Sequence, residues 1–112
     1  MAAANYDIII DQGSDFAVQL TLTEDDAPKN LSGYAARAQL RTKKTSTTVS
    51  ADFECNIISA DEGVINMAMR NTVNQDLAPG IYYYDLEIHT PNDVIVVRLI
   101  QGKATVTQEV TR

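Results

Sequence analysis

Asp85 and Glu87 are the residues whose type and spacing most resemble catalytic machinery. They stand two positions apart in a strand-like segment, so their side chains share one strand face, roughly 7 Å apart. Carboxylates paired at about this separation carry out acid and base chemistry in glycoside hydrolases. The same spacing arises by chance in most strands, and nothing around it predicts a cleft. We therefore assign these two residues no catalytic role.

Cys55 and His89 are the remaining candidates for nucleophilic or acid–base catalysis. A catalytic Ser or Cys needs a neighbouring base, and His89, the only histidine, stands at the end of a strand beside a turn. Cys55 alternates inward between Phe53 and Ile57, which is typical of a buried and unreactive thiol. One cysteine and one histidine far apart in the sequence do not supply the ligands of a zinc site.

The densest acidic run consists of Glu24, Asp25 and Asp26. It lacks the alternating ligands, central glycine and terminal glutamate of a calcium-binding loop, and a solvated turn explains it better. The sequence also lacks a glycine-rich phosphate loop. We therefore expect a protein that is not an enzyme and that uses no metal and no cofactor.

The overall charge argues against a nucleic-acid partner. The 112 residues carry a formal net charge of −6, and an acidic chain repels phosphate backbones. The length suits one domain spanning 1–112, with a globular balance of 45% hydrophobic and 21% charged residues. The start, MAAANYDIII, has no basic segment and its apolar run ends at Asp11, so we expect neither a signal peptide nor a membrane span.

Alternation of apolar and polar residues dominates the chain and predicts strands. In FAVQLTLT, Phe16, Val18, Leu20 and Leu22 share one face while polar or small residues share the other. Similar segments cover 6–10, 34–42, 51–58, 64–70, 80–90 and 94–111, the last with a kink or bulge at Gly102. The fold class predicted is all-β: an antiparallel immunoglobulin-like β-sandwich of seven to eight strands, with one short helical turn near 71–78.

Three consecutive tyrosines divide between the two faces of their strand. Tyr82 and Tyr84 alternate with the apolar residues of the core, whereas Tyr83 points outward beside Asp85 and Glu87. The sequence APGIY, with a glycine two residues before Tyr82, matches the tyrosine corner of immunoglobulin-like sandwiches. We expect the Tyr82 hydroxyl to bond back to the preceding turn. Tyr83 is either a surface residue or an interface anchor.

Four segments resemble small modules of tailed-bacteriophage virions: IDQGSDF, NLSGYAARAQLR, LAPGIYYYDLEI and RLIQGKATVTQEVTR. The chain is similar to the N-terminal domains of baseplate and receptor-binding-protein adaptors, and to free-standing virion proteins of this length. The resemblance implies a sandwich scaffold with a structural role and carries over no functional residues. Relatives with several domains continue into a receptor-binding extension, whereas this chain ends at Arg112, which favours an accessory or adaptor part.

The expected function is therefore docking onto larger proteins of a phage tail or baseplate, in a virion assembled in the host cytoplasm. Contacts would come from strand edges and from two arms, 1–5 and 107–112, in a homo-oligomer or in multiple copies, with no membrane partner. Candidate interface residues are Ala2, Ala3, Ala4, Asn5, Arg37, Arg41, Tyr83, Glu109, Val110, Thr111 and Arg112. The two arginines meet either an acidic partner or the chain's own acids. Capsid decoration and carbohydrate binding are the alternatives.

Overall fold

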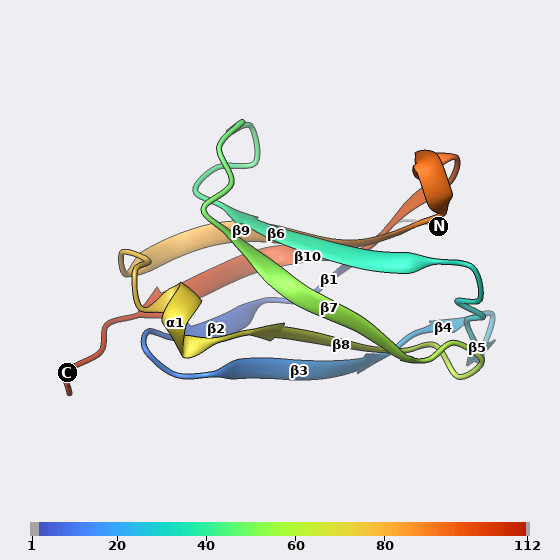
Figure 1. Cartoon of the computed structure of the whole chain (residues 1–112), viewed down its shortest axis with the longest axis horizontal. Helices are drawn as coiled ribbons and strands as arrows, with labels where there is room; N and C mark the ends of the chain where they lie inside the picture. The colour runs from blue at the N-terminus through green and yellow to red at the C-terminus, as the bar shows by residue number, and fades with distance from the viewer. Residues whose placement is uncertain (1–2, 112) are drawn as a thin grey trace.

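The chain forms one large curled sheet and one small hairpin, shown in Figure 1. A computed structural model describes residues 3–111. In chain order the elements are β1 (Ala4–Asn5), β2 (Ile8–Asp11), β3 (Phe16–Thr21), β4 (Thr23–Glu24), β5 (Ala27–Pro28), β6 (Ala35–Arg41), β7 (Ala51–Ser59), β8 (Val64–Met69), α1 (Asn71–Asn74), β9 (Gly80–His89), the 3-10 turn η1 (Pro91–Asp93) and β10 (Val96–Thr107).

The main sheet has the strand order β1-β10-β9-β6-β7-β8-β3, and β2 also pairs with β10. Strand β7 joins its two halves. The start of β7, up to Phe53, pairs with β6, and the rest, from Glu54 onward, pairs with β8. The sheet therefore folds over along β7. Figure 1 shows β6, β9 and β10 in one layer and β8 and β3 in the facing layer, with β7 crossing between them.

The prediction of a purely antiparallel sheet is wrong, because β1 and β2 both run parallel to β10. Ala4 is in register with Ile100, and Ile8 is in register with Ala104. The remaining pairings described in the main sheet are antiparallel. The eight strands of the main sheet and the two of the small hairpin make ten, where seven to eight were predicted. Side-chain alternation tells which residues a strand buries but not which neighbour it takes or in which direction, so the sequence pattern carried no signal for this pairing.

The two predicted arms differ in structure. Ala4 and Asn5 form β1 against β10, so this part of the 1–5 segment belongs to the sheet, although both side chains are exposed. The 107–112 segment begins where β10 ends at Thr107, and residues 108–111 continue without regular structure. Residues 1, 2 and 112 lie outside the part that the structure describes, and with them the candidate contacts Ala2 and Arg112.

The core lies between the two layers and follows the predicted alternation most clearly in β9. Tyr82, Tyr84, Leu86 and Ile88 are buried, while the intervening residues of β9 remain partly exposed. The fully buried side chains of largest volume come from both layers: Ile10, Leu31, Leu40, Ile65, Met67, Met69, Leu86, Ile88 and Val106. The strand segments predicted at 51–58 and 64–70 are also present as β7 and β8, which pair as a hairpin through Ile57 and Ile65.

The short helix α1 lies within the helical turn predicted near 71–78. Its first turn receives a cap from a distant segment, because the Asp15 carboxylate accepts hydrogen bonds from the backbone and side-chain N–H groups of Asn71, both at 2.8 Å. The backbone bond is the main reason that the pKa of Asp15 is lowered. Such a cap satisfies a donor that a helix start leaves unpaired. Within residues 3–111, no helix is long and apolar enough to cross a membrane.

A set of side-chain hydrogen bonds, here called the polar clasp (Gln12, Gly13, Ser14 and Asn74), fastens the β2–β3 turn to α1. Asn74 is fully buried. Its Oδ1 accepts from the Gly13 N–H at 2.7 Å, and its Nδ2 donates to the Ser14 carbonyl at 2.7 Å. The Gln12 side chain accepts from the Glu109 N–H at 3.0 Å. The clasp therefore supplies the backbone of this turn with partners that no strand ladder provides.

Tyr82 begins the buried row of β9 and bonds back to the preceding turn. Its hydroxyl donates to the Ala78 carbonyl oxygen at 2.7 Å, four residues upstream. This is the arrangement of a tyrosine corner, in which a buried hydroxyl ties a strand to the turn before it.

We expect Tyr82→Phe to lower the free energy of unfolding by about 0.5–1.5 kcal/mol, because the part-buried hydrogen bond from the Tyr82 hydroxyl to the Ala78 carbonyl is lost. Tyr83→Phe is the matched control, since its ring lies on the opposite strand face and its hydroxyl makes no described hydrogen bond. Thermal unfolding should show a lower Tm for Tyr82→Phe alone. Equal melting temperatures for the two variants would contradict a stabilising corner.

Gly102 is a point of close backbone approach. The predicted bulge in β10 lies elsewhere, between Arg98 and Ile100. A Cβ on Gly102 would collide with the Tyr6 carbonyl oxygen of the neighbouring N-terminal segment. Tyr84, in register with Gly102, donates its hydroxyl to this same oxygen, and burial raises the pKa of that hydroxyl well above its usual value. Because Gly102 has no side chain, the Tyr84 side chain of β9 has room to reach past β10 to the Tyr6 carbonyl.

Candidate functional site

The outward-pointing side chains of β6, β9 and β10 form a surface that we call the outer face. Strand register sets them in three rows: Arg37, Glu87 and Arg98; Gln39, Asp85 and Gln101; Arg41, Tyr83 and Lys103. The central strand β9 supplies the middle residue of each row. Arg37, Arg41 and Tyr83, which the sequence predicts as contacts, all lie on this one face.

The two carboxylates of this face are held by arginines. Arg37 Nε lies 2.5 Å from Glu87 Oε1, and Arg98 Nε lies 3.2 Å from Asp85 Oδ2. The hydrogen bond to Glu87 also raises the pKa of Arg37 above its ordinary value. Exposed pairs of this kind stabilise a fold by about 0.2–1 kcal/mol each. Arg37 therefore meets the chain's own acids, one of the two possibilities left open by the sequence.

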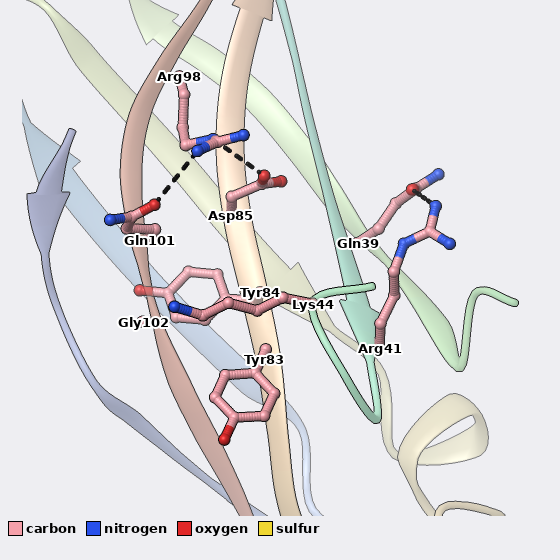
Figure 2. Close-up of a pocket in the computed structure, with 9 residues that line it drawn as sticks. All are labelled: Gln39, Arg41, Lys44, Tyr83, Tyr84, Asp85, Arg98, Gln101 and Gly102. Atoms are coloured by element: carbon pink, nitrogen blue, oxygen red, sulfur yellow. Dashed lines mark hydrogen bonds and ion pairs between the residues drawn. The ribbon is translucent and has the colours of Figure 1, made fainter. Parts of the chain in front are cut away.

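A shallow depression of about 160 Å³ opens on the outer face beside Tyr83 (Figure 2). Its lining comprises Gln39, Arg41, Lys44, Tyr83, Tyr84, Asp85, Arg98, Gln101 and Gly102. The Lys44 ammonium lies 5.7 Å from the centre of the Tyr83 ring, within the range of a cation–π contact. This lysine comes from the 42–50 loop, which Figure 1 shows rising above the sheet.

Arg41 has only neutral hydrogen-bond partners. Its guanidinium donates to the Gln39 side-chain oxygen and to the Ser46 carbonyl, each at 2.9 Å. Lys44 contacts the Tyr83 ring and lies in none of the ion pairs described for residues 3–111. Both cations line the same depression, and neither has a carboxylate partner among the ion pairs described, although the chain has six more acidic than basic residues. They make this part of the outer face locally positive.

The tip of the β9–β10 hairpin is a second exposed feature, and it was not among the contacts predicted from the sequence. Val94, Ile95 and Val96 are 79%, 48% and 43% exposed. The backbone beneath them is well fixed, because Thr90 exchanges hydrogen bonds of 2.8 and 2.9 Å with Ile95. The unbroken apolar run VIVV at 94–97 could have indicated this feature. A half-buried strand buries only every second residue, so some side chains of such a run must be exposed.

The remaining predicted contacts do not join the outer face. Val110 and Thr111 are exposed beyond β10, with Val110 at 89%. Glu109 is partly buried and is tied to the polar clasp through its backbone N–H. Ala3 and Ala4 lie at the N-terminal edge of the sheet, beside β10. The candidate contacts thus fall into separate surfaces.

The acidic run forms the turn of the small β4–β5 hairpin. Asp25 and Asp26 connect its strands and both have positive φ, 54° and 64°, as in a tight two-residue turn. Glu24 pairs with Lys29 at 2.7 Å. Among the described residues, no three His, Cys, Asp or Glu side chains gather as they would around a metal ion. His89 lies away from this turn, with Nδ1 3.4 Å from Asp93 Oδ1.

Cys55 lies on β7 and packs against the core, as the alternation of its segment predicts. Burial raises the pKa of its thiol from 9.0 to about 11. Because the thiolate is the reactive form, this thiol is poorly suited to nucleophilic chemistry near neutral pH.

Alkylation of Cys55 by iodoacetamide should be about a hundredfold slower than that of an exposed thiol at pH 7.5, because two pKa units lower the thiolate fraction by this factor. The rate should rise with pH until it levels off near pH 11. Mass spectrometry of time points gives the rate, and the unfolded chain in denaturant is the control. Folded and unfolded chains reacting equally fast at pH 7.5 would contradict a raised pKa.

Comparison with known proteins gives a fold and no family. No protein-family model matches the sequence, and no curated protein matches it. Solved structures match, among them a family 123 glycoside hydrolase from Clostridium perfringens, studied for glycolipid glycan hydrolysis, with 9% identity and a TM-score of 0.55 over 97% of this chain. The chain spans 24% of the length of that enzyme. The likeness therefore concerns the fold alone.

Proposed function

We propose that the protein is a non-catalytic docking module of a tailed-phage virion, attached to larger proteins of the tail or baseplate. The observation that carries the docking role is the hairpin tip, where Val94, Ile95 and Val96 are exposed in succession. Apolar side chains gathered on the surface mark protein–protein contact sites, and a fixed backbone lowers the entropy lost on binding. The virion setting is supported by the sequence resemblance to phage modules.

We infer further that the fold is an immunoglobulin-like sandwich, although its sheet is mixed. Support comes from the two facing layers joined by β7 and from the Tyr82 hydrogen bond to the Ala78 carbonyl. A sandwich presents its hairpins and edge strands as contact surfaces on a rigid scaffold. Such a scaffold suits a protein present in multiple copies in a particle assembled in the host cytoplasm.

The test is incorporation into particles. The double variant Val94→Asn with Ile95→Asn should reduce the copies per virion at least about tenfold, because each exposed apolar side chain contributes about 1–2 kcal/mol when an interface buries it. Quantitative mass spectrometry of purified virions measures the change. Ile58→Asn is the matched control, since Ile58 is 58% exposed on β7, away from the tip.

Two other outcomes would redirect the proposal. Undiminished incorporation of the tip variant would remove the tip as the docking element, and a chain absent from virions would remove the virion role. Radial sectioning of virion density decides between the tail and the capsid-decoration alternative.

Carbohydrate binding is the second candidate, and the depression beside Tyr83 favours it. An aromatic ring next to the amides of Gln39 and Gln101 offers both stacking and hydrogen bonds to a sugar. A glycan array tests this role directly, with Tyr83→Ala as the binding-site variant. The absence of any signal on the array would eliminate it.

A further inference from the structure

The lining of the depression holds more cations than carboxylates: Arg41, Lys44 and Arg98 against Asp85, which pairs with Arg98. Arg41 is half-buried and bonds to neutral oxygens, and Lys44 lies against the Tyr83 ring. Arg37, Arg70 and Arg98, by contrast, each meet a carboxylate. A depression whose lining carries an excess of positive charge is a site for an anion from outside the chain.

The β4–β5 turn carries negative charge that complements this positive depression. Asp25 and Asp26 are exposed, and in the part of the chain that the structure describes neither takes part in an ion pair or a side-chain hydrogen bond. Their positive φ angles fix them at the end of a tight turn, so both carboxylates project from the molecule on a defined backbone.

The two features are too far apart to meet within one chain. Figure 1 shows β4 and β5 at one end of the long axis, whereas the 42–50 loop rises from the far end of β6. The molecule is 43 Å long on this axis. Contact between them therefore requires two molecules.

We propose that a second copy of this chain inserts its Asp25–Asp26 turn into the depression formed by Arg41, Lys44 and Tyr83. Carboxylates of the turn would accept from the free N–H groups of the Arg41 guanidinium and from the Lys44 ammonium. The depression has a volume of only about 160 Å³, and the incoming turn is short, with two residues between β4 and β5. The contact joins two different surfaces, the turn of one copy and the depression of the next. It is therefore head-to-tail and generates a ring or a filament rather than a closed dimer.

This contact goes beyond docking to other virion proteins, because it is formed by the purified chain alone. Sedimentation velocity over a concentration series should show weak association at 0.02 M salt that disappears at 1 M salt, where charges are screened within about 3 Å. Lys44→Glu should weaken association at least about tenfold, because a like charge then faces the incoming turn. Lys43→Glu is the matched control on the same loop, outside the depression, and should associate like the wild type.

The acidic side is tested by Asp25→Asn with Asp26→Asn, since asparagine tolerates positive φ and only the charge is lost. Asp76→Asn, an exposed aspartate near α1, is its control. The Lys44→Glu chain keeps an intact turn, and the Asp25→Asn, Asp26→Asn chain keeps an intact depression. Each alone should remain monomeric, while an equimolar mixture should form a 1:1 complex that grows no further.

Several outcomes would overturn the inference. They are association of the turn variant equal to that of the wild type, a mixture that stays monomeric, or a monomeric wild type at low salt that instead binds glucuronic acid in the depression. Because the hairpin tip is unchanged in all these chains, particle incorporation reports on the proposed virion docking separately.

Discussion

Asn74→Ala is expected to lower the free energy of unfolding by about 2–4 kcal/mol, since a buried polar group left without a partner costs about 1–3 kcal/mol. The substitution removes both partners of the β2–β3 turn at once, namely the acceptor for the Gly13 N–H and the donor to the Ser14 carbonyl. The site is fully buried, so water does not replace them without opening the turn. Urea unfolding followed by circular dichroism measures the loss.

Asn71→Ala is the matched control for this prediction. It removes the same amide from the same helix, but the Asn71 amide is at the surface and its hydrogen bond to Asp15 is exposed. We expect a loss below about 1 kcal/mol. If the two variants unfold at the same urea concentration, the polar clasp does not stabilise the fold in the way described.

Gly102→Ala should have the second large effect, a destabilisation of up to about 3 kcal/mol from overpacking. The new methyl group meets backbone atoms of Tyr6, which have little freedom to move. We therefore expect the N-terminal segment to separate from β10. Hydrogen exchange should accelerate at the Tyr6 amide, which donates to the Gln101 carbonyl at 2.9 Å, and at the Lys103 amide, which donates to Asp7 at 2.9 Å.

Gly33→Ala is the control that distinguishes crowding by an added methyl group from strain in the glycine backbone. Gly33 has φ +82° and nothing within 4 Å of an added Cβ, so any loss there reflects its left-handed conformation alone. Exchange at the Tyr6 amide should stay as slow as in the wild type. If the Tyr6 amide of Gly102→Ala also exchanges as slowly as in the wild type, the N-terminal segment stays on β10 and the prediction is wrong.

The sequence predicted the fold where side-chain alternation alone determines it. The buried row of β9, the inward Cys55 and the strands β7 and β8 all follow from this pattern. Strand neighbours did not follow, because β1 and β2 pair with β10 through backbone groups that are alike in every residue. A shared face likewise depends on register, which the sequence does not state.

The site was less predictable than the fold. Arg37 and Arg41 look equivalent in the sequence, two outward arginines on one strand, yet only Arg37 meets carboxylates. The difference depends on Glu87 and Asp93, which are more than 40 residues away along the chain. Asn74 looked like one residue of a polar turn, and its burial depends on the β2–β3 turn folding over it.

The pairing of β1 with β10 has a consequence for biosynthesis. Ala4 pairs with Ile100, which is translated 96 residues later, so β1 has no partner in the sheet while the residues between them are being synthesised. Contacts this distant in sequence are slow to form because a long loop must close first. The backbone groups of β1 therefore stay unpaired until β10 has been translated, and a chaperone or a neighbouring copy has that interval in which to bind them.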